Sequence, residues 1–261
     1  MTDSAQDFSR LARPGGHHLA YVSRPGNRGG NSPTVVFLGG FRSDMTGTKA
    51  LALDIWARQA GFAFLRFDYF AHGASSGRFE DATVGRWIDD ALAVIEAATG
   101  ARKLVLIGSS MGGWIMLNIA KRLRHRLAGL VGIAAAPDFT QELIWPELSA
   151  ADQATLKRDG RLLRPSRYTP EPDILTLRLI EEGAEHLVLD KPLDLPCPLH
   201  LLHGTADPEV PWQLSLRILE HVTAPEATLT LVKDGDHRLS QPSDIERLTD
   251  IVAKIASSPT R

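Results

Sequence analysis

The sequence changes from strand to turn to helix within one short stretch, Leu104-Val-Leu-Ile-Gly-Ser-Ser-Met-Gly-Gly-Trp114. Its four leading apolar residues predict a buried strand, and residues 111–123 show the apolar spacing of a helix. The turn between them fits G-x-S-x-G, the pattern of a sharp turn that presents a nucleophilic serine at the edge of a sheet. Ser110 is therefore the candidate nucleophile. The alternative is an ordinary glycine–serine turn that caps the helix.

A serine hydroxyl needs a base, and the base needs an acid that orients it. Asp207 follows a later predicted strand, in His203-Gly-Thr-Ala-Asp-Pro208, and His237 follows the last one, in Lys233-Asp-Gly-Asp-His-Arg238. The chain order Ser, Asp, His is the order expected for an α/β-hydrolase. Because each candidate follows a strand, all three are expected at one edge of a parallel sheet. The sequence thus predicts a triad of Ser110, His237 and Asp207.

Other residues compete for the two supporting roles. Asp138 also follows a predicted strand, so it is the main alternative to Asp207 as the acid, although Asp207 is favoured. His203 precedes the acid loop, where a hydrogen-bonded structural histidine is the simpler interpretation. Asp234 and Asp236 are interpreted as turn formers beside the candidate base. Several further histidines lack such a loop after a strand: His17, His18, His125, His186, His200 and His221.

A tetrahedral intermediate needs hydrogen-bond donors for its oxyanion. The backbone N–H of Met111, the residue after the candidate nucleophile, is one expected donor. The other is expected from the loop Gly39-Gly40-Phe41, with the N–H of Phe41 as the candidate, although a simple Gly-Gly turn fits this segment almost as well. Asp68 and His72 follow the next predicted strand and are expected to form structural pairings rather than to catalyse.

Short apolar runs alternate with helical patterns, which predicts an α/β-hydrolase fold with a mostly parallel central sheet and helices on both faces. Residues 137–197 interrupt this alternation, and a loop of that length needs structure of its own. We therefore expect a helical cap inserted into a core formed by residues 1–136 and 198–261. A capping box at Ser243-Asp-Ile-Glu246 is expected to open the final helix. The predicted strands are 18–23, 34–38, 62–67, 103–107, 127–135, 199–202 and 228–232, and the predicted helices are 46–60, 83–98, 111–123, 150–158, 173–182 and 243–257.

Composition narrows the class of protein. The 261 residues carry a formal net charge of −2, which argues against binding of nucleic acid or an anionic membrane. The single cysteine, Cys197, permits no intramolecular disulfide and is expected to be a buried, inert thiol. Neither a metalloprotease spacing nor a nucleotide-binding glycine motif occurs, so we expect no metal and no cofactor. The polar N-terminus and the lack of an apolar run of about 20 residues predict a cytoplasmic protein without membrane insertion.

Several motifs of this chain recur together in one group of proteins. They are Ser43-Asp-Met-Thr-Gly-Thr-Lys-Ala50, Phe64-Leu-Arg-Phe-Asp-Tyr69, Gly108-Ser-Ser-Met-Gly-Gly-Trp114, Leu202-His-Gly-Thr-Ala-Asp-Pro-Glu-Val-Pro-Trp212 and Asp236-His-Arg238. With these motifs the chain resembles the α/β-hydrolases grouped around the mitochondrial α/β-hydrolase domain-containing protein 10, together with their bacterial relatives. The resemblance is weakest in the predicted cap. Because no mitochondrial targeting segment is evident, we expect a bacterial, cytoplasmic relative.

The resemblance implies serine esterase or thioesterase chemistry, such as palmitoyl-protein thioesterase or acyl-glucuronide esterase activity, with nucleophile, acid and base at Ser110, Asp207 and His237. We therefore expect hydrolysis of a small-molecule ester or an acylated protein through an acyl-enzyme at Ser110. A peptidase of the same fold and a non-catalytic ligand-binding α/β-hydrolase stay open as alternatives. Apolar side chains of the cap would either cover an acyl chain or pack the cap onto the core: Leu143, Ile144, Trp145, Leu175, Leu177 and Leu179.

Overall fold

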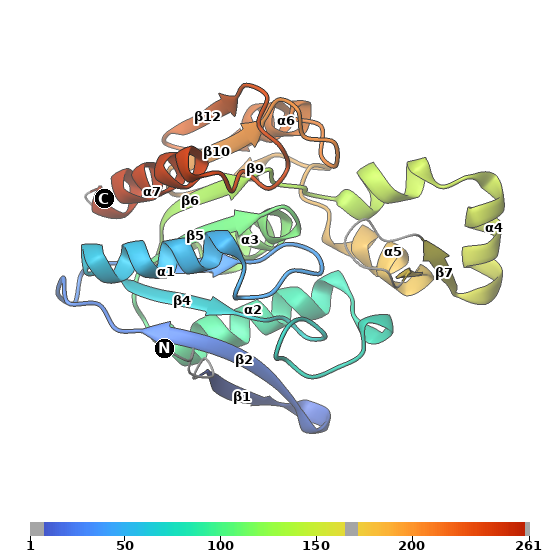
Figure 1. The fold of residues 1–261 in the computed structure, drawn as a ribbon, viewed down its shortest axis with the longest axis horizontal. Helices are drawn as coiled ribbons and strands as arrows, with labels where there is room; N and C mark the ends of the chain where they lie inside the picture. Colours follow the sequence, from blue (N-terminus) through green and yellow to red (C-terminus); the bar gives the residue numbers. More distant parts are fainter. Residues whose placement is uncertain (1–7, 165–171, 259–261) are drawn as a thin grey trace.

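An eight-stranded sheet forms the centre of the molecule in a computed structural model that describes residues 8–164 and 172–258 (Figure 1). The strand order is β1-β2-β4-β3-β5-β6-β10-β12. β2 is antiparallel to both β1 and β4, and the pairings from β4 to β12 are parallel. The strands are β1 (Ser9–Arg13), β2 (His17–Arg24), β3 (Thr34–Leu38), β4 (Ala63–Phe67), β5 (Leu104–Ser109), β6 (Leu127–Ile133), β10 (Leu199–Gly204) and β12 (Ala227–Val232).

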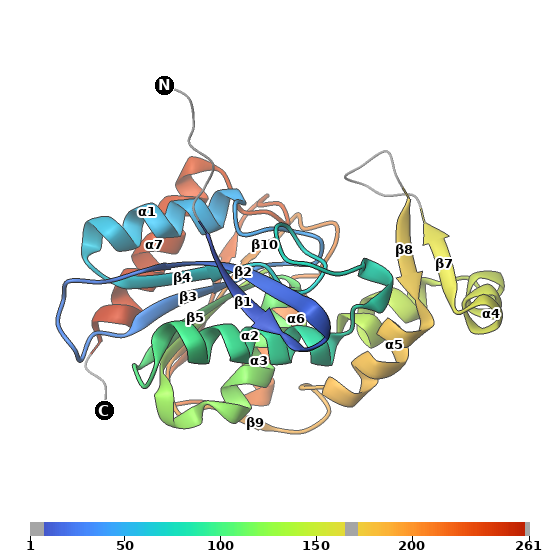
Figure 2. The ribbon, with the colours of Figure 1, turned by 90° about the horizontal axis from the view of Figure 1, so that it is seen from below.

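Helices cover both faces of this sheet (Figure 2). On one face lie α1 (Thr48–Ala60) and α7 (Pro242–Ser257). The opposite face carries α2 (Val84–Thr99), α3 (Met111–Arg122) and α6 (Gln213–His221). The sequence-based prediction of an α/β-hydrolase fold is confirmed. No helix in residues 8–164 and 172–258 is long and apolar enough to cross a membrane.

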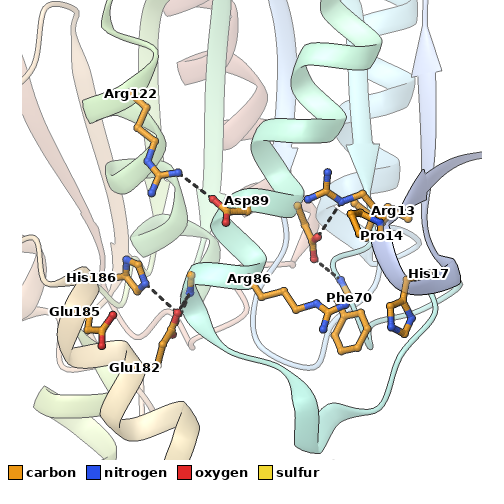
Figure 3. Close-up of a pocket in the computed structure, with 13 residues that line it drawn as sticks. Arg13, Pro14, His17, Phe70, Arg86, Asp89, Arg122, Glu182, Glu185 and His186 are labelled. Carbon is orange, nitrogen blue, oxygen red and sulfur yellow. Dashed lines mark hydrogen bonds and ion pairs between the residues drawn. The ribbon is translucent and has the colours of Figure 1, made fainter.

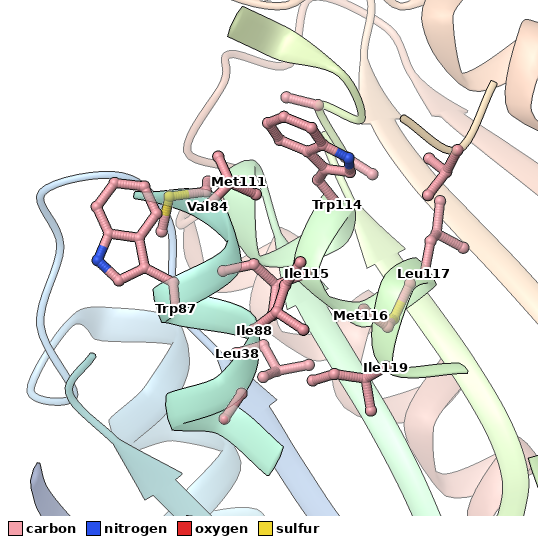
Figure 4. Close-up of a cluster of buried hydrophobic side chains, with 14 of the residues drawn as sticks. Leu38, Val84, Trp87, Ile88, Met111, Trp114, Ile115, Met116, Leu117 and Ile119 are labelled. Atoms are coloured by element: carbon pink, nitrogen blue, oxygen red, sulfur yellow. The ribbon is translucent and has the colours of Figure 1, made fainter. Parts of the chain in front are cut away.

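The central parallel strands are continuous apolar runs because helices bury both of their faces. Every residue of β3 and of β5 is buried. Trp87 of α2 and Trp114 of α3 are completely inaccessible to solvent (Figure 4), and their rings pack against Phe41 and Phe139, respectively. Close packing of these large side chains resists movement of α2 and α3 against the loops that follow β3 and β6.

We call residues 137–197 the cap, and its described elements from Thr140 to Gly183 project beyond the C-terminal ends of the parallel strands (Figure 1). Its elements are a π-helical turn (Thr140–Ile144), α4 (Ala150–Asp159), β7 (Arg161–Arg164), β8 (Asp173–Thr176), α5 (Leu177–Gly183) and β9 (Leu193–Asp194). β7 and β8 pair as an antiparallel hairpin, and β9 pairs with β11 (Val222–Thr223) beyond the cap.

Some local predictions differ from the structure. The expected helix 173–182 begins only at Leu177, because the four residues before it pair with β7 and pairing outweighs the weak local pattern. The capping box of α7 uses Gln241 and Asp244, not Ser243 and Glu246. Pro242 explains this shift, since its fixed φ suits the first position of a helix. No predicted element corresponds to β1, α6 or the short strands β7, β9 and β11.

Candidate active site

Ser110 lies in a strained turn between β5 and α3. Its φ of 54° and ψ of −120° are unusual for a residue with a side chain. Two backbone hydrogen bonds hold this conformation: Ser110 N–H donates to the Ile133 carbonyl at 2.9 Å, and Ala136 N–H donates to the Ser110 carbonyl at 3.1 Å. The turn is thus fixed against the end of β6, which is the geometry of a nucleophile elbow.

Glycines around Ser110 allow α3 to start unusually close to the sheet. A Cβ atom on Gly112 would overlap the carbonyl oxygen of Leu38, and one on Gly108 would overlap the carbonyl oxygen of Gly112. Any larger side chain at these positions would push the start of α3 away from β3 and β5. Glycine is therefore required for steric reasons at both glycine positions of the G-x-S-x-G pattern.

The structure brings the three residues of the predicted triad into one hydrogen-bonded chain. Ser110 Oγ lies 3.1 Å from His237 Nε2, and His237 Nδ1 lies 2.7 Å from Asp207 Oδ2. The Asp207 side chain is completely buried, whereas the His237 side chain is 14% exposed. A buried carboxylate that orients a histidine beside a serine hydroxyl is the arrangement that nucleophilic catalysis by serine requires.

The acid and base loops lie side by side because β10 and β12 are neighbouring parallel strands. Thr205 N–H donates to the Val232 carbonyl at 2.9 Å, and Ala206 N–H donates to the Gly235 carbonyl at 3.0 Å. At Gly204 a Cβ atom would overlap the same Gly235 carbonyl. These backbone bonds hold the loop of Asp207 against the loop of His237.

Asp207 accepts hydrogen bonds at both carboxylate oxygens. Oδ1 accepts from the N–H groups of Glu209 and Val210 at 2.8 and 2.9 Å, and Oδ2 contacts His203 Nε2 at 3.1 Å as well as His237. Burial by itself raises the pKa of Asp207, but the hydrogen bonds from His203 and His237 outweigh it and hold the pKa well below its usual value. Asp207 therefore stays ionised.

His203 contributes more to this site than the sequence indicated. It is completely buried, and its Nε2 also lies 3.0 Å from the Val210 carbonyl while its Nδ1 lies 2.7 Å from Ser215 Oγ. Because a carbonyl can only accept, Nε2 carries the hydrogen and Ser215 donates to Nδ1. The expectation of a hydrogen-bonded structural histidine is confirmed, and its partner is the candidate acid itself.

The loop after β3 passes beside Ser110. A Cβ atom on Gly40 would lie 3.4 Å from the Cβ of Ser110, and Ser43 Oγ donates to the Gly40 carbonyl at 2.9 Å. Within the described residues, no acceptor takes the backbone N–H of Phe41 or of Met111. Both expected oxyanion donors therefore have no acceptor in residues 8–164 and 172–258.

The alternative acid, Asp138, is engaged elsewhere. It is 2% exposed, and its two carboxylate oxygens accept hydrogen bonds from the N–H groups of Val188 and Leu189, each at 2.9 Å. Burial raises the pKa of Asp138, opposed by these two hydrogen bonds. Asp138 joins the first residues of the cap to a segment near its end, whereas the bond to His237 is made by Asp207.

Asp68 and His72 have structural partners, although not one another. Asp68 accepts from Met45 N–H at 2.6 Å and from Ala74 N–H at 2.8 Å, and burial raises its pKa to about 6. His72 instead accepts a hydrogen bond from Arg42 N–H at 3.1 Å. Backbone groups of the loops around the end of β4 are thus the partners of both side chains.

The remaining two side chains are a cysteine outside the site, before the start of β10, and a glutamate beside the base. Cys197 is buried, and burial raises its pKa to about 12, so the thiol stays protonated, as expected. Glu209, which the sequence analysis did not single out, places Oε2 3.7 Å from His237 Nε2. It follows Asp207 by two residues, and only the fold of the acid loop reveals that it faces the base. No three His, Cys, Asp or Glu side chains in the described part of the chain are arranged to hold a metal ion.

A cavity of about 480 Å³ lies away from Ser110, between the β1–β2 turn, the start of α2 and the end of α5 (Figure 3). Most of its charged side chains face oppositely charged or hydrogen-bonding neighbours. The pairs are Arg13–Asp90 (3.7 Å), Arg122–Asp89 (2.9 Å) and His186–Glu182 (3.0 Å). The cavity is thus a polar contact region between core and cap, and most of the charges that line it already face protein partners.

The apolar side chains of the cap pack on the core. Leu175 and Leu179 are buried within the cluster that contains Trp87 and Trp114. Partly buried members pack against the same cluster: Leu143, Ile144, Trp145 and Leu177. Of the two roles expected for these residues, attachment of the cap is the one the packing shows.

Fold and site together define a serine hydrolase of the α/β-hydrolase fold. The family model described as "Serine aminopeptidase, S33" matches residues 30–174, which is more than half of the chain. The chain belongs to this hydrolase family.

Relatives and solved structures agree with that assignment. The mitochondrial palmitoyl-protein thioesterase ABHD10 of Mus musculus is 36% identical over 236 residues, covering 87% of this chain and 78% of the relative. A putative hydrolase from Agrobacterium vitis is 42% identical, with a TM-score of 0.91 over 96% of this chain and 99% of that one. The structure of mouse α/β-hydrolase domain-containing protein 10 is 33% identical, with a TM-score of 0.85 over 95% and 98% of the two chains.

Proposed function

We propose that this chain hydrolyses carboxylic esters or thioesters by transferring the acyl group to Ser110. The observation that carries the proposal is the hydrogen-bonded chain from Ser110 Oγ through His237 to the buried Asp207, at a strained turn. A structural serine needs neither the strain nor a histidine held by a carboxylate. Both features are needed if Ser110 attacks a carbonyl carbon, because the serine must then be exposed and must lose its proton to a base.

His237 acts as the general base in this mechanism. Because the ionised Asp207 accepts the hydrogen on Nδ1, the lone pair of Nε2 faces Ser110 Oγ. As Oγ bonds to the carbonyl carbon, its proton passes to Nε2, and Asp207 stabilises the imidazolium that forms. The imidazolium then protonates the departing alcohol or thiol. Water activated by the same base releases the acid from the acyl-enzyme.

The oxyanion of each tetrahedral intermediate accepts hydrogen bonds from the backbone N–H groups of Phe41 and Met111. Both donors have no protein acceptor among the described residues, and the Phe41 loop passes directly beside Ser110. Fixed donors of this kind contribute about 10²–10³ in rate for each hydrogen bond. Because backbone N–H groups supply these hydrogen bonds, no side chain is needed to stabilise the oxyanion.

The substrate class follows from the relatives. Relatives more than 30% identical over most of both chains are named palmitoyl-protein thioesterase, which favours an acylated cysteine or a comparable small-molecule ester. Glu209 Oε2, 3.7 Å from His237 Nε2, adds a carboxylate beside the base, and comparing acyl-glucuronides with neutral esters of the same acid tests whether it affects the choice of leaving group.

The test is a chain-length series of p-nitrophenyl esters and acyl-cysteine thioesters, with Ser110→Ala beside the wild type. Ser110→Ala should lower kcat by about 10⁴-fold or more. Ser109→Ala, at the neighbouring serine, is the matched control and should keep most of the activity. A fluorophosphonate probe should label the wild type at Ser110. Activity that survives Ser110→Ala, or a wild type that no probe labels, would refute the proposal and favour a non-catalytic ligand-binding protein.

A peptidase is the second candidate, because the family model is that of a serine aminopeptidase. An aminopeptidase must bind the α-ammonium group of its substrate, and Glu209 is a carboxylate close to the base. Aminoacyl p-nitroanilides test this directly. Hydrolysis that depends on Glu209 and is lost in Glu209→Gln would favour the peptidase, whereas esterase activity without amide cleavage favours the first proposal.

A further inference from the structure

Arg42 occupies an unusual position in the loop between β3 and α1. Its φ of 56° lies in the left-handed region, which a residue with a side chain adopts at an energetic cost. It follows Phe41, the candidate oxyanion donor, so the orientation of Arg42 constrains the peptide group next to that donor. We call residues 39–43 the oxyanion loop. Two contacts, one from the core and one from the cap, hold Arg42 in this conformation.

The core contact is His72. Its Nδ1 lies 3.1 Å from the Phe70 carbonyl, which can only accept, so Nδ1 carries the hydrogen and Nε2 accepts from Arg42 N–H at 3.1 Å. His72 is 3% exposed, and burial lowers its pKa to about 4. The histidine is therefore neutral and fixed in one tautomer. Three aromatic rings surround it: Tyr69, Phe79 and Trp87.

The cap contact comes from β8. The Arg42 guanidinium lies 3.0 Å from Asp173 Oδ1, an ion pair without the geometry of a hydrogen bond, and it donates to the Ile174 carbonyl at 3.4 Å. Between core and cap, the same guanidinium stacks 4.2 Å from the ring centroid of Phe79. Both side chains of the ion pair are 29% exposed, so solvent screens this pair less than it screens a fully exposed one.

We propose that Arg42 is a positioning residue that couples the cap to the oxyanion loop, because His72 fixes its backbone and Asp173 fixes its side chain. A displacement of β8 then acts through Arg42 on the N–H of Phe41. Since the oxyanion forms only during reaction, the coupling affects kcat more than KM. The catalytic part of this inference rests on the proposed function, and the structural part does not.

The first experiment is a double-mutant cycle with Arg42→Gln, Asp173→Asn and their combination. p-Nitrophenyl acetate is the substrate, because its acyl group is too short to need the cap. Each single variant should lower kcat about fivefold with little change in KM, and the double variant should be no slower than the slower single one. The affinity for a trifluoromethyl ketone, which forms a tetrahedral oxyanion on the serine, should fall by the same factor as kcat.

The matched control is the pair Arg217→Gln and Glu142→Gln. These residues form another ion pair between core and cap, at 2.7 Å, but it joins α6 to the π-helical turn and does not involve the oxyanion loop. The control variants should keep the wild-type kcat on p-nitrophenyl acetate. If they lower kcat as much as Arg42→Gln does, the effect comes from general loosening of the cap and the proposal is wrong.

A second pair of variants tests the core contact. In His72→Gln the side-chain oxygen can replace Nε2 as the acceptor for Arg42 N–H, whereas His72→Asn is too short and retains only a donor for the Phe70 carbonyl. His72→Gln should therefore keep kcat near the wild-type value, and His72→Asn should lower it about fivefold at unchanged KM. Equal losses in both variants would overturn the role of this hydrogen bond.

Amide hydrogen exchange separates this proposal from the proposed function, since it needs no activity. Asp173→Asn and His72→Asn should each speed exchange in the oxyanion loop, while Glu142→Gln should not. A wild type without hydrolase activity would refute the proposed function but leave this measurement valid. An active wild type whose loop exchange and kcat do not respond to Asp173→Asn would overturn the coupling alone.

Discussion

The loops at the sheet edge and the cap position their polar side chains in different ways. Asp207 is completely buried, and backbone hydrogen bonds tie its loop to the neighbouring loop of His237. Between cap and core, Arg42–Asp173 and Arg217–Glu142 are partly exposed ion pairs in which the core supplies a long arginine side chain. Backbone bonds fix a geometry more closely than exposed ion pairs do, because long side chains keep alternative rotamers.

Because of this difference, we expect the catalytic step to depend on the sheet edge and the choice of substrate to depend on the cap. Buried hydrogen bonds hold Ser110, His237 and Asp207 at the sheet edge. Changes in the cap can therefore alter the choice of substrate without abolishing catalysis. The cap is joined to the core at a few specific points, such as Glu142 with Arg217 and Glu182 with the N–H of Gly85. We therefore expect substitutions at the sheet edge to change kcat by orders of magnitude, and those in the cap, apart from the coupling residue Asp173, to change mainly stability or substrate preference.

The strongest test of this comparison exchanges one carboxylate in each region. Asp207→Asn should lower kcat about 10³–10⁴-fold, because the amide cannot hold the required tautomer of His237. Asp138→Asn should leave kcat nearly intact but lower the free energy of unfolding by about 1–3 kcal/mol, since one of two buried N–H groups loses its acceptor. Steady-state kinetics and urea unfolding measure the two effects. The comparison fails if Asp138→Asn is the variant that loses activity.

The pH dependence of stability tests whether the core keeps His72 buried and neutral. The unfolded chain protonates His72 near its usual pKa of 6.5, whereas the folded chain resists until about pH 4, so acid favours unfolding between these values. The wild type should therefore lose on the order of 3 kcal/mol relative to His72→Gln between pH 7 and pH 4. Urea unfolding of both variants at several pH values measures this difference.

Other groups also titrate in this pH range. Because they are present in both wild type and His72→Gln, their contributions cancel when the two stabilities are subtracted. The pKa of Asp68 is raised to about 6, so its effect has the opposite sign and stabilises the folded chain as the pH falls. Arg42 and Asp44, the charged groups that act on His72, are present in both variants. Parallel stability curves for wild type and His72→Gln would show that His72 is not a buried neutral histidine.

A smaller effect on kcat is expected from His203, which touches the acid but not the serine. His203→Gln should lower kcat about tenfold and shift the acid limb of the pH profile, because Asp207 loses a neighbouring donor. Ser215→Ala removes only the bond to the other ring nitrogen of His203 and should cost less. A Ser215→Ala variant that is slower than His203→Gln would contradict this order.

The smallest effect is expected at the joint between cap and core. Glu182 accepts the N–H of Gly85 at 2.8 Å, in the first turn of α2. Glu182→Ala should lower the free energy of unfolding by about 1 kcal/mol and leave hydrolysis of short esters unchanged. Thermal unfolding and p-nitrophenyl acetate kinetics check both statements, with Glu185→Ala as the control. A large loss of kcat would show that the contact between Glu182 and Gly85 affects catalysis at Ser110.

The candidate site was predictable from local sequence to a considerable extent. An apolar run followed by glycines marks the end of a buried strand, and in a parallel sheet such ends meet at one edge. Ser110, Asp207 and His237 all follow such runs, so their proximity follows from local patterns. Asp138 satisfies the same rule, and only its bonds to Val188 and Leu189 show that it holds the cap instead.

By itself, the sequence determined the class of fold, the strained turn at Ser110 and the order of the three candidate residues. These features depend on apolar periodicity and on glycines within a few residues, where local sterics decide the backbone. Only the tertiary structure decided that His203 supports Asp207, that Glu209 faces His237 and that Arg42 joins His72 to Asp173. Such contacts depend on loop conformations and on how an inserted segment packs, which no local pattern encodes.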